Sequence, residues 1–124
     1  MPAITEYVDS KGRNHYAEFF NDLPAVAAAK VTVAVVRMET GHSSGLKSLG
    51  AGLAEWRIDW GKGIRIYVHQ DGDELIVLMG GGDKSDQSKE IEKAIDLVKE
   101  YKQRKKQSKE ATKKATTVKR KNKK

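Results

Sequence analysis

The stretch Glu74-Leu75-Ile76-Val77-Leu78-Met79-Gly80-Gly81-Gly82-Asp83-Lys84-Ser85-Asp86-Gln87 decides the fold of this chain. Its apolar residues leave no polar face, as expected of a strand in the middle of a sheet. Three glycines follow, and a helix is predicted from about Asp86. Glycine has no Cβ to obstruct a ligand, and amides at a helix N-terminus attract anions. The corner suits a phosphate, which we expect an RNA backbone to supply, although a tight strand-to-helix turn would use the same glycines.

The residues around this stretch predict an α+β fold with the order β-α-α-β-β-β-α, an antiparallel meander with helices packed on one face. A Gly/Ser-rich connection is expected at 42–52, and Asp71-Gly72 is a hairpin signal. The expected strands are Ala3–Val8, Glu55–Trp60, Ile64–His69 and Glu74–Met79; the expected helices are Asn14–Leu23, a second one capped by Asp22 with Pro24 in its first turn and ending at Gly41, and a last one from about Asp86 to Tyr101.

Charge divides the 124 residues into two parts. Residues 102–124 hold twelve of the 24 Lys/Arg and one of the 17 Asp/Glu, a balance of +11. Residues 1–101 therefore carry twelve basic and sixteen acidic side chains, or −4. We expect one domain at 1–101 and a Lys-rich extension, helical or disordered, at 102–124. Such an extension is either a solvated tail or a contact to a polyanion.

Composition excludes several classes of site. There is no cysteine, so neither a disulfide nor a thiolate zinc site can form. No run approaches the ~18 apolar residues of a membrane span, and the N-terminus does not resemble a signal peptide. We therefore expect a soluble cytoplasmic protein, without metal or cofactor, that does not bind membranes.

The Gly61-Lys62-Gly63 turn predicts a hairpin with Asp59 opposite Arg65 and Arg57 opposite Tyr67. Alternation places one set of side chains on the core side under the helices and the other on an open face. The core set is Trp56, Ile58, Trp60, Ile64, Ile66 and Val68; the open set is Glu55, Arg57, Asp59, Arg65, Tyr67 and His69. Ordinary cross-strand pairs on a solvated face would give the same pattern.

The open face could cleave RNA. Attack of a ribose 2′-hydroxyl on the adjacent phosphate builds negative charge, which Arg65 and Lys84 could stabilise. A proton must also leave the 2′-oxygen and another must reach the 5′-oxygen. His69 titrates in the right range, and Tyr67 could donate a proton or stack on a base.

Three ordered motifs resemble the RelE/ParE toxin superfamily in its HigB-like, phage-derived branch, over about residues 3–101. Gly45–Ile58 looks like the family's K-x-L-G-x-G-L-x-E-x-R-I segment, and Gly63–Tyr67 looks like its G-x-R-[aliphatic]-[aromatic] strand. Gly81–Gln87, followed by Ile91 and Ala94, is similar to its G-G-[D/N]-K-S-x-Q-x-x-x-I-x-x-A close.

The resemblance implies a RelE-like fold and the toxin of a bacterial type II toxin–antitoxin pair. It implies an mRNA interferase that cuts messenger RNA in the ribosomal A site without a metal. A helix-turn-helix, HigA-like antitoxin would neutralise it, and only that complex would bind operator DNA. Arg65 corresponds to the arginine at the scissile phosphate, and Lys84 to a second basic residue. RNA would also contact Lys47, Arg57, Lys62 and Gln87.

The chain departs from the family at the start of the last helix. Ser88, Lys89 and Glu90 stand where some relatives carry an active-site tyrosine. Either Tyr67 or His69 would have to serve, or catalysis would rest on positioning and charge stabilisation. Two other functions stay open. One is a ParE-type toxin that binds gyrase and does not cut RNA, and the other is a non-catalytic prophage relic that binds RNA.

Overall fold

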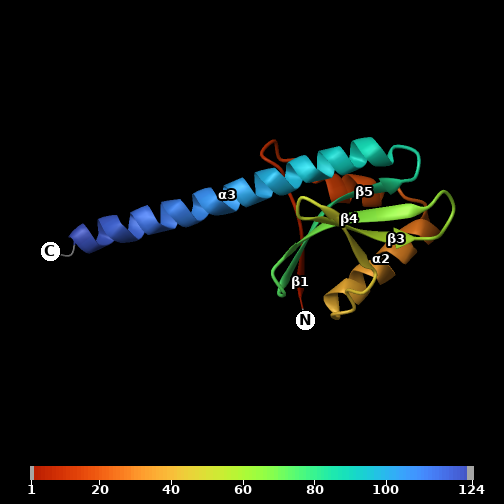
Figure 1. Cartoon of the computed structure of the whole chain (residues 1–124), viewed down its shortest axis with the longest axis horizontal. Helices are drawn as coiled ribbons and strands as arrows, with labels where there is room; N and C mark the ends of the chain where they lie inside the picture. The colour runs from red at the N-terminus through yellow and green to blue at the C-terminus, as the bar shows by residue number, and fades with distance from the viewer. Residues whose placement is uncertain (1, 123–124) are drawn as a thin grey trace.

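A computed structural model describes the backbone of residues 2–122 and the side chains of residues 2–108 (Figure 1). The chain forms an α+β fold with one mixed five-stranded sheet. The elements are β1 (Ala3–Glu6), α1 (His15–Asn21), α2 (Ala25–Glu39), β2 (Leu46–Gly50), β3 (Leu53–Ile58), β4 (Ile64–Asp71), β5 (Leu75–Asp83) and α3 (Gln87–Asn122).

The strand order is β1-β5-β4-β3-β2. The meander from β3 to β5 is antiparallel, as predicted, and β2 extends it. β1 pairs with β5 in parallel, so the expectation of a purely antiparallel sheet is wrong. The prediction also missed β2, which lies within the segment expected to be a connection. Apolar and polar residues alternate only weakly in Leu46–Gly50, and Gly50 lies where the pairing with β3 shifts register.

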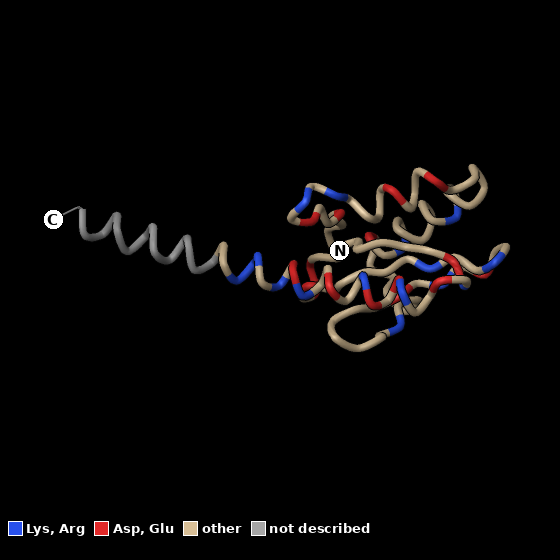
Figure 2. Tube along the Cα trace, turned by 90° about the horizontal axis from the view of Figure 1, so that it is seen from above, with Lys and Arg blue, Asp and Glu red and all other residues tan. Residues whose placement is uncertain are grey.

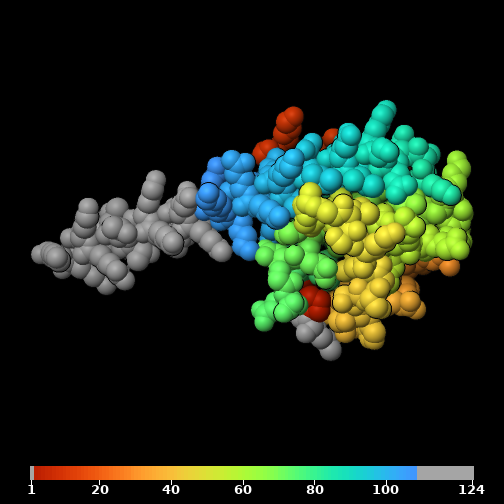
Figure 3. Space-filling model, in the orientation of Figure 1, coloured from red at the N-terminus to blue at the C-terminus, as the bar shows by residue number. Residues whose placement is uncertain are grey.

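Helices cover both faces of the sheet, which corrects the expectation of a single covered face. α1 and α2 pack on one face against Ile66, Val68, Ile76 and Leu78. α3 packs on the other face, where Ala94, Leu97 and Val98 meet Leu53, Tyr67, Val77 and Met79. Figures 1 and 3 show α3 lying across the strands on the side away from α2. The doubly apolar run of β5 contained this information, because a strand exposed on one face would carry polar residues there.

A side chain caps the start of α1, whereas the predicted cap of α2 is wrong. The Asn14 side chain accepts a hydrogen bond from the Ala17 amide and caps α1, which begins one residue later than predicted. Asp22 closes α1 instead of capping α2, and Pro24 is the residue before Ala25, where α2 begins. α3 continues as one helix into the basic segment that begins at residue 102; residues 123–124, and the side chains from 109 on, lie outside the described part.

The three glycines belong to β5 itself, which runs through Asp83 before α3 begins. Side chains from both helical layers fill the space that they leave. A Cβ on Gly81 would overlap the Phe19 ring of α1, and a Cβ on Gly82 would overlap the Glu90 carboxylate of α3. In this structure the glycines admit the chain's own side chains to the strand backbone, where a ligand was expected.

Gly81→Ala should destabilise the fold by about 1–3 kcal/mol, because the aromatic ring of Phe19 must move to admit a methyl group. Gly80→Ala is the matched control, since its Cβ would lie 3.9 Å from the nearest atom, in ordinary contact with His15. Urea unfolding of the two variants measures the difference. Equal stabilities would show that Phe19 does not fill the space above Gly81.

Candidate functional site: a buried arginine and an acidic cleft

The β3–β4 hairpin has a different register from the predicted one. Arg57 pairs with Arg65, and Glu55 pairs with Tyr67, a shift of two residues. The shift arises because the turn takes in Asp59 and Trp60 as well as Gly61–Gly63, and both of these glycines have positive φ. Trp60 is therefore exposed and does not join the predicted core. A shift of two keeps every strand residue on its predicted face.

The face predicted to be open is covered by α3. Glu55, Arg65, Tyr67 and His69 are exposed by only 0, 7, 1 and 8%, respectively. The expectation that these residues line an open binding face is therefore wrong for all four. The cause is the apolar stripe of α3, which buries itself on this side of the sheet.

Arg65 sits in an ion pair that satisfies it only partly. Its Nε lies 3.6 Å from Oε2 of Glu55, while Arg57 donates a 2.7 Å hydrogen bond from its Nε to Oε1 of the same carboxylate. Arg65 Nε and Nη1 and Glu55 Oε2 are buried without a hydrogen-bond partner among the described residues. Two guanidinium groups on neighbouring strands therefore share one carboxylate, and the buried one has unused donors.

Glu90, on α3, lies over the sheet beside Arg65 and Tyr67. Its carboxylate lies over Gly82, the register partner of Arg65 on β5, and the Tyr67 hydroxyl donates a long 3.5 Å hydrogen bond to it. Burial, together with the charges of Asp83 and Asp86, raises the pKa of Glu90. Burial and the Glu90 charge raise the pKa of Tyr67 to about 12, so its hydroxyl stays protonated at neutral pH.

His69 has a structural role in this arrangement. Its Nδ1 lies 2.7 Å from the Gly52 carbonyl oxygen and must donate to it, because a carbonyl only accepts. The imidazole also packs edge-on against the Tyr101 ring, 5.5 Å between centroids. These contacts join β4 to the turn before β3 and to α3, so His69 is not placed as a base at an open site.

The remaining predicted residues lie on the surface. Lys47, Lys62 and Lys84 are exposed, Arg57 is about half exposed, and Gln87 is partly buried at the first residue of α3. Lys47 pairs with Glu55 across β2 and β3, so it lies two residues along the strands from the Arg57–Arg65 row. The structure thus brings together Lys47, Arg57 and Arg65, while Lys62, Lys84 and Gln87 belong to other segments.

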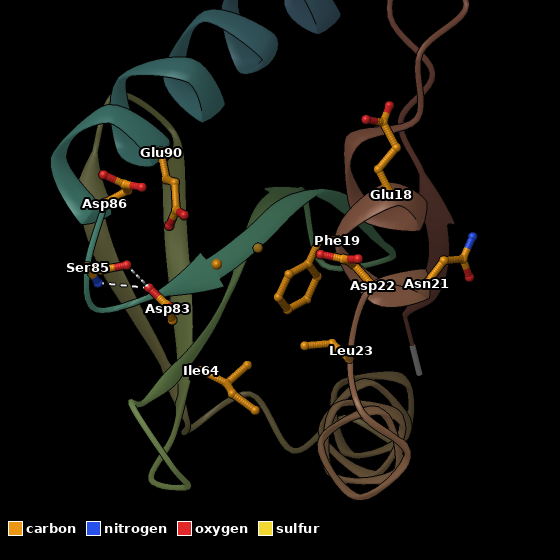
Figure 4. Close-up of a pocket in the computed structure, with 12 residues that line it drawn as sticks. Glu18, Phe19, Asn21, Asp22, Leu23, Ile64, Asp83, Ser85, Asp86 and Glu90 are labelled. Atoms are coloured by element: carbon orange, nitrogen blue, oxygen red, sulfur yellow. Dashed lines mark hydrogen bonds between the residues drawn. The ribbon is translucent and has the colours of Figure 1, made fainter.

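The glycine segment of β5 does border a cleft, of about 850 Å³, between α1 and the start of α3 (Figure 4). The cleft is lined by Glu18, Asp22, Asp83, Asp86 and Glu90, and no basic side chain lines it. A second cavity of about 180 Å³ shares Glu18, Gly81 and Glu90 with it and adds Arg13, His15, Lys93 and Tyr67. A phosphate would meet carboxylates in the larger cleft, contrary to the expectation for this corner. The run Asp83, Asp86, Glu90 in the sequence was the signal that could have revealed this.

No family model matches the chain. An uncharacterized protein of Haemophilus influenzae is 39% identical over 74 residues, which are 60% of this chain and 75% of that protein. The chain belongs to the family of this Haemophilus protein. This relationship does not indicate an activity, because the Haemophilus protein is itself uncharacterized.

The described residues contain neither a membrane-spanning helix nor a metal-binding cluster. None of the helices there has both the length and the apolar character that a membrane span needs. In the same part of the chain, no group of three or more His, Asp or Glu side chains is arranged to hold a metal ion.

Glu55→Leu should destabilise the protein by about 3–5 kcal/mol, because it leaves the Arg65 cation buried without its counter-charge. The double variant Glu55→Leu/Arg65→Met, which removes both charges, should recover most of this loss. Denaturant unfolding of both single variants and the double variant completes the cycle. Additive losses would mean that the two side chains do not act as a pair.

Glu90→Gln should raise the melting temperature at neutral pH, because it removes a charge that burial, Asp83 and Asp86 disfavour. The pKa of Glu90 is higher in the folded state than its ordinary value of 4.5. The cost of its charge is therefore present above the folded pKa and disappears as the pH falls toward 4.5. Melting curves from pH 7 to pH 4.5 should show the advantage of Gln shrinking. An advantage that is constant with pH would contradict an origin in charge.

Proposed function

We propose that the chain is the toxin of a bacterial type II toxin–antitoxin pair, with a RelE-like topology, and that it acts on messenger RNA. The three motifs that resemble the RelE/ParE superfamily lie on β2–β3, on β4 and at the β5–α3 junction. These segments are neighbours in the sheet, so motifs that are separate in sequence meet at one place.

The observation that carries the proposal is the row Arg57–Arg65–Gly82 across β3, β4 and β5. Arginines directly opposite each other repel, and a buried guanidinium with unused donors lowers stability. The fold does not need the buried charge of Arg65, because an apolar residue at this position would pack as well. Strained electrostatics of this kind are typical of a site that binds charge, and a guanidinium with free donors suits a phosphate.

In this proposal Arg65 stabilises the scissile phosphate while the ribose 2′-oxygen gives its proton to solvent water and attacks phosphorus, and the bond from phosphorus to the 5′-oxygen breaks. Arg57 and Lys47, exposed beside it, hold the neighbouring phosphates. Because the Glu90 carboxylate lies over Gly82, it must move away before a phosphate can reach Arg65. Tyr67, protonated at neutral pH and beside Glu90, is placed to donate to the leaving oxygen.

Arg65→Lys tests the proposal, since it keeps a cation beside Glu55 but loses the paired donors of the guanidinium. We expect it to abolish growth arrest on induction and to slow message cleavage by 100-fold or more, about 2.7 kcal/mol. Primer extension on cellular messages after brief induction measures the cleavage, and the melting temperature shows whether the variant is folded. Lys89→Ala, an exposed lysine on α3, is the control. A folded Arg65→Lys variant that cuts like the parent would refute the role of Arg65.

The burial of Arg65, Tyr67 and His69 favours a second candidate, a toxin of the same superfamily that does not cut RNA and instead inhibits gyrase. Such a toxin would need no accessible proton donor or acceptor on the sheet. A supercoiling assay with purified gyrase separates the two. Inhibition without any cleaved message would establish this candidate in place of the nuclease.

A further inference from the structure

The outer side of α2 carries an apolar stripe that no described part of the chain covers. Val26, Val33 and Val36 are exposed by 56, 53 and 51%, and with Ala29 they repeat at spacings of 3, 4 and 3. This spacing places all four on one side of the helix. α2 therefore buries one face in the core, through Ala27, Val31, Ala34 and Met38, and presents a second apolar face to solvent.

A groove of about 510 Å³ runs beside this stripe, between α2 and the edge of β3. Trp56 and Ile58 contribute apolar surface from the strand. β2 pairs with β3 only as far as Trp56, so Arg57 and Ile58 lie beyond the end of β2 and leave the groove open on that side. An exposed apolar face of this kind beside a groove is typical of a protein-binding surface.

The charged residues of the groove are Lys30, Arg37 and Arg57, and no acidic residue lines it. Lys30 and Arg37 are seven residues apart, or about 10 Å along the helix. A partner that matches this surface needs apolar side chains in the middle and carboxylates beside them. A second copy of this chain, docked through the same surface, would bring the three cations toward one another.

We infer that this surface, defined by Val26, Ala29, Val33 and Val36 with Lys30, Arg37 and Arg57 beside them, binds an acidic amphipathic helix of the antitoxin. The partner helix presents one apolar stripe to α2 and carries acidic residues about seven positions apart, opposite Lys30 and Arg37. The helical spacing of the valines favours a helix as the partner element. This inference rests on the proposed function, which supplies the antitoxin as partner.

Val33→Asp places a charge in the middle of the stripe. We expect it to weaken binding of the antitoxin, produced from the adjacent gene of the proposed pair, by at least about 30-fold, the effect of losing a central contact. Val8→Asp is the matched control, because Val8 is an exposed valine outside this surface. The double variant Lys30→Glu/Arg37→Glu should weaken binding about tenfold and reverse its salt dependence, with Lys89→Glu/Lys99→Glu as control. Calorimetry with the co-expressed and separately purified proteins measures the affinities.

Val33→Asp should also arrest growth despite co-expression of the adjacent gene, since the variant keeps its toxic surface but escapes neutralisation. If both Val33→Asp and the charge-reversal variant bind like the parent, this surface is not the interface, while the proposed function stands. If the parent chain forms dimers that Val33→Asp converts to monomers, a second copy is the occupant and the inference is wrong. If the parent does not bind the adjacent gene's product, the pairing fails and the inference fails with it.

Discussion

The carboxylate of Glu55 is fully buried in the middle of the sheet, and two arginines depend on it. Arg57 reaches it from the surface, whereas Arg65 lies beneath α3 and uses only part of its hydrogen-bonding capacity. Since β3 and β4 place these arginines directly opposite each other, the hairpin brings together two like charges that share the Glu55 carboxylate. The electrostatics of the face under α3 therefore depend on this one group.

The two-sided covering of the sheet determines what that buried charge can do. α3 packs its apolar stripe over Tyr67, Val77 and Met79, and its first turns carry Glu90 to the backbone of Gly82. The glycine segment makes this close approach possible from α3 and, through Phe19, from α1. A residue with a side chain at Gly82 would push Glu90 away from Arg65 and Tyr67. The glycines therefore control how tightly the helical layers close on the charged group.

The sequence predicted the α+β class, the β3–β5 meander and the division of the hairpin into two faces, because a period of two is robust to register errors of two residues. The predictions that failed concern features that tertiary packing determines. β2 has little alternation and depends on pairing with β3. The burial of Arg65 and His69 depends on which face α3 covers, which no local pattern in residues 55–69 reveals. The acidic residues Asp83, Asp86 and Glu90 could have predicted an acidic cleft. The prediction of a phosphate site instead followed from the glycines alone.

Charge is distributed so that a polyanion has a preferred direction of approach. The cleft between α1 and α3 is lined by five carboxylates and would repel it. The segment 102–124 has a charge balance of +11 and begins with Lys102, Arg104, Lys105 and Lys106. Figure 2 shows Lys and Arg residues on α3 where the helix leaves the body. Attraction by this segment acts over about a Debye length, roughly 8–10 Å, and raises the encounter rate without selecting a sequence. Under the proposed function, selection would fall to the β2–β3 side, where Lys47 and Arg57 are exposed beside the buried Arg65. Under the proposed function, an RNA held there would approach Arg65 away from the cleft. Of the five cleft carboxylates, Glu90 is the one that accepts the hydrogen bond of Tyr67 on this face.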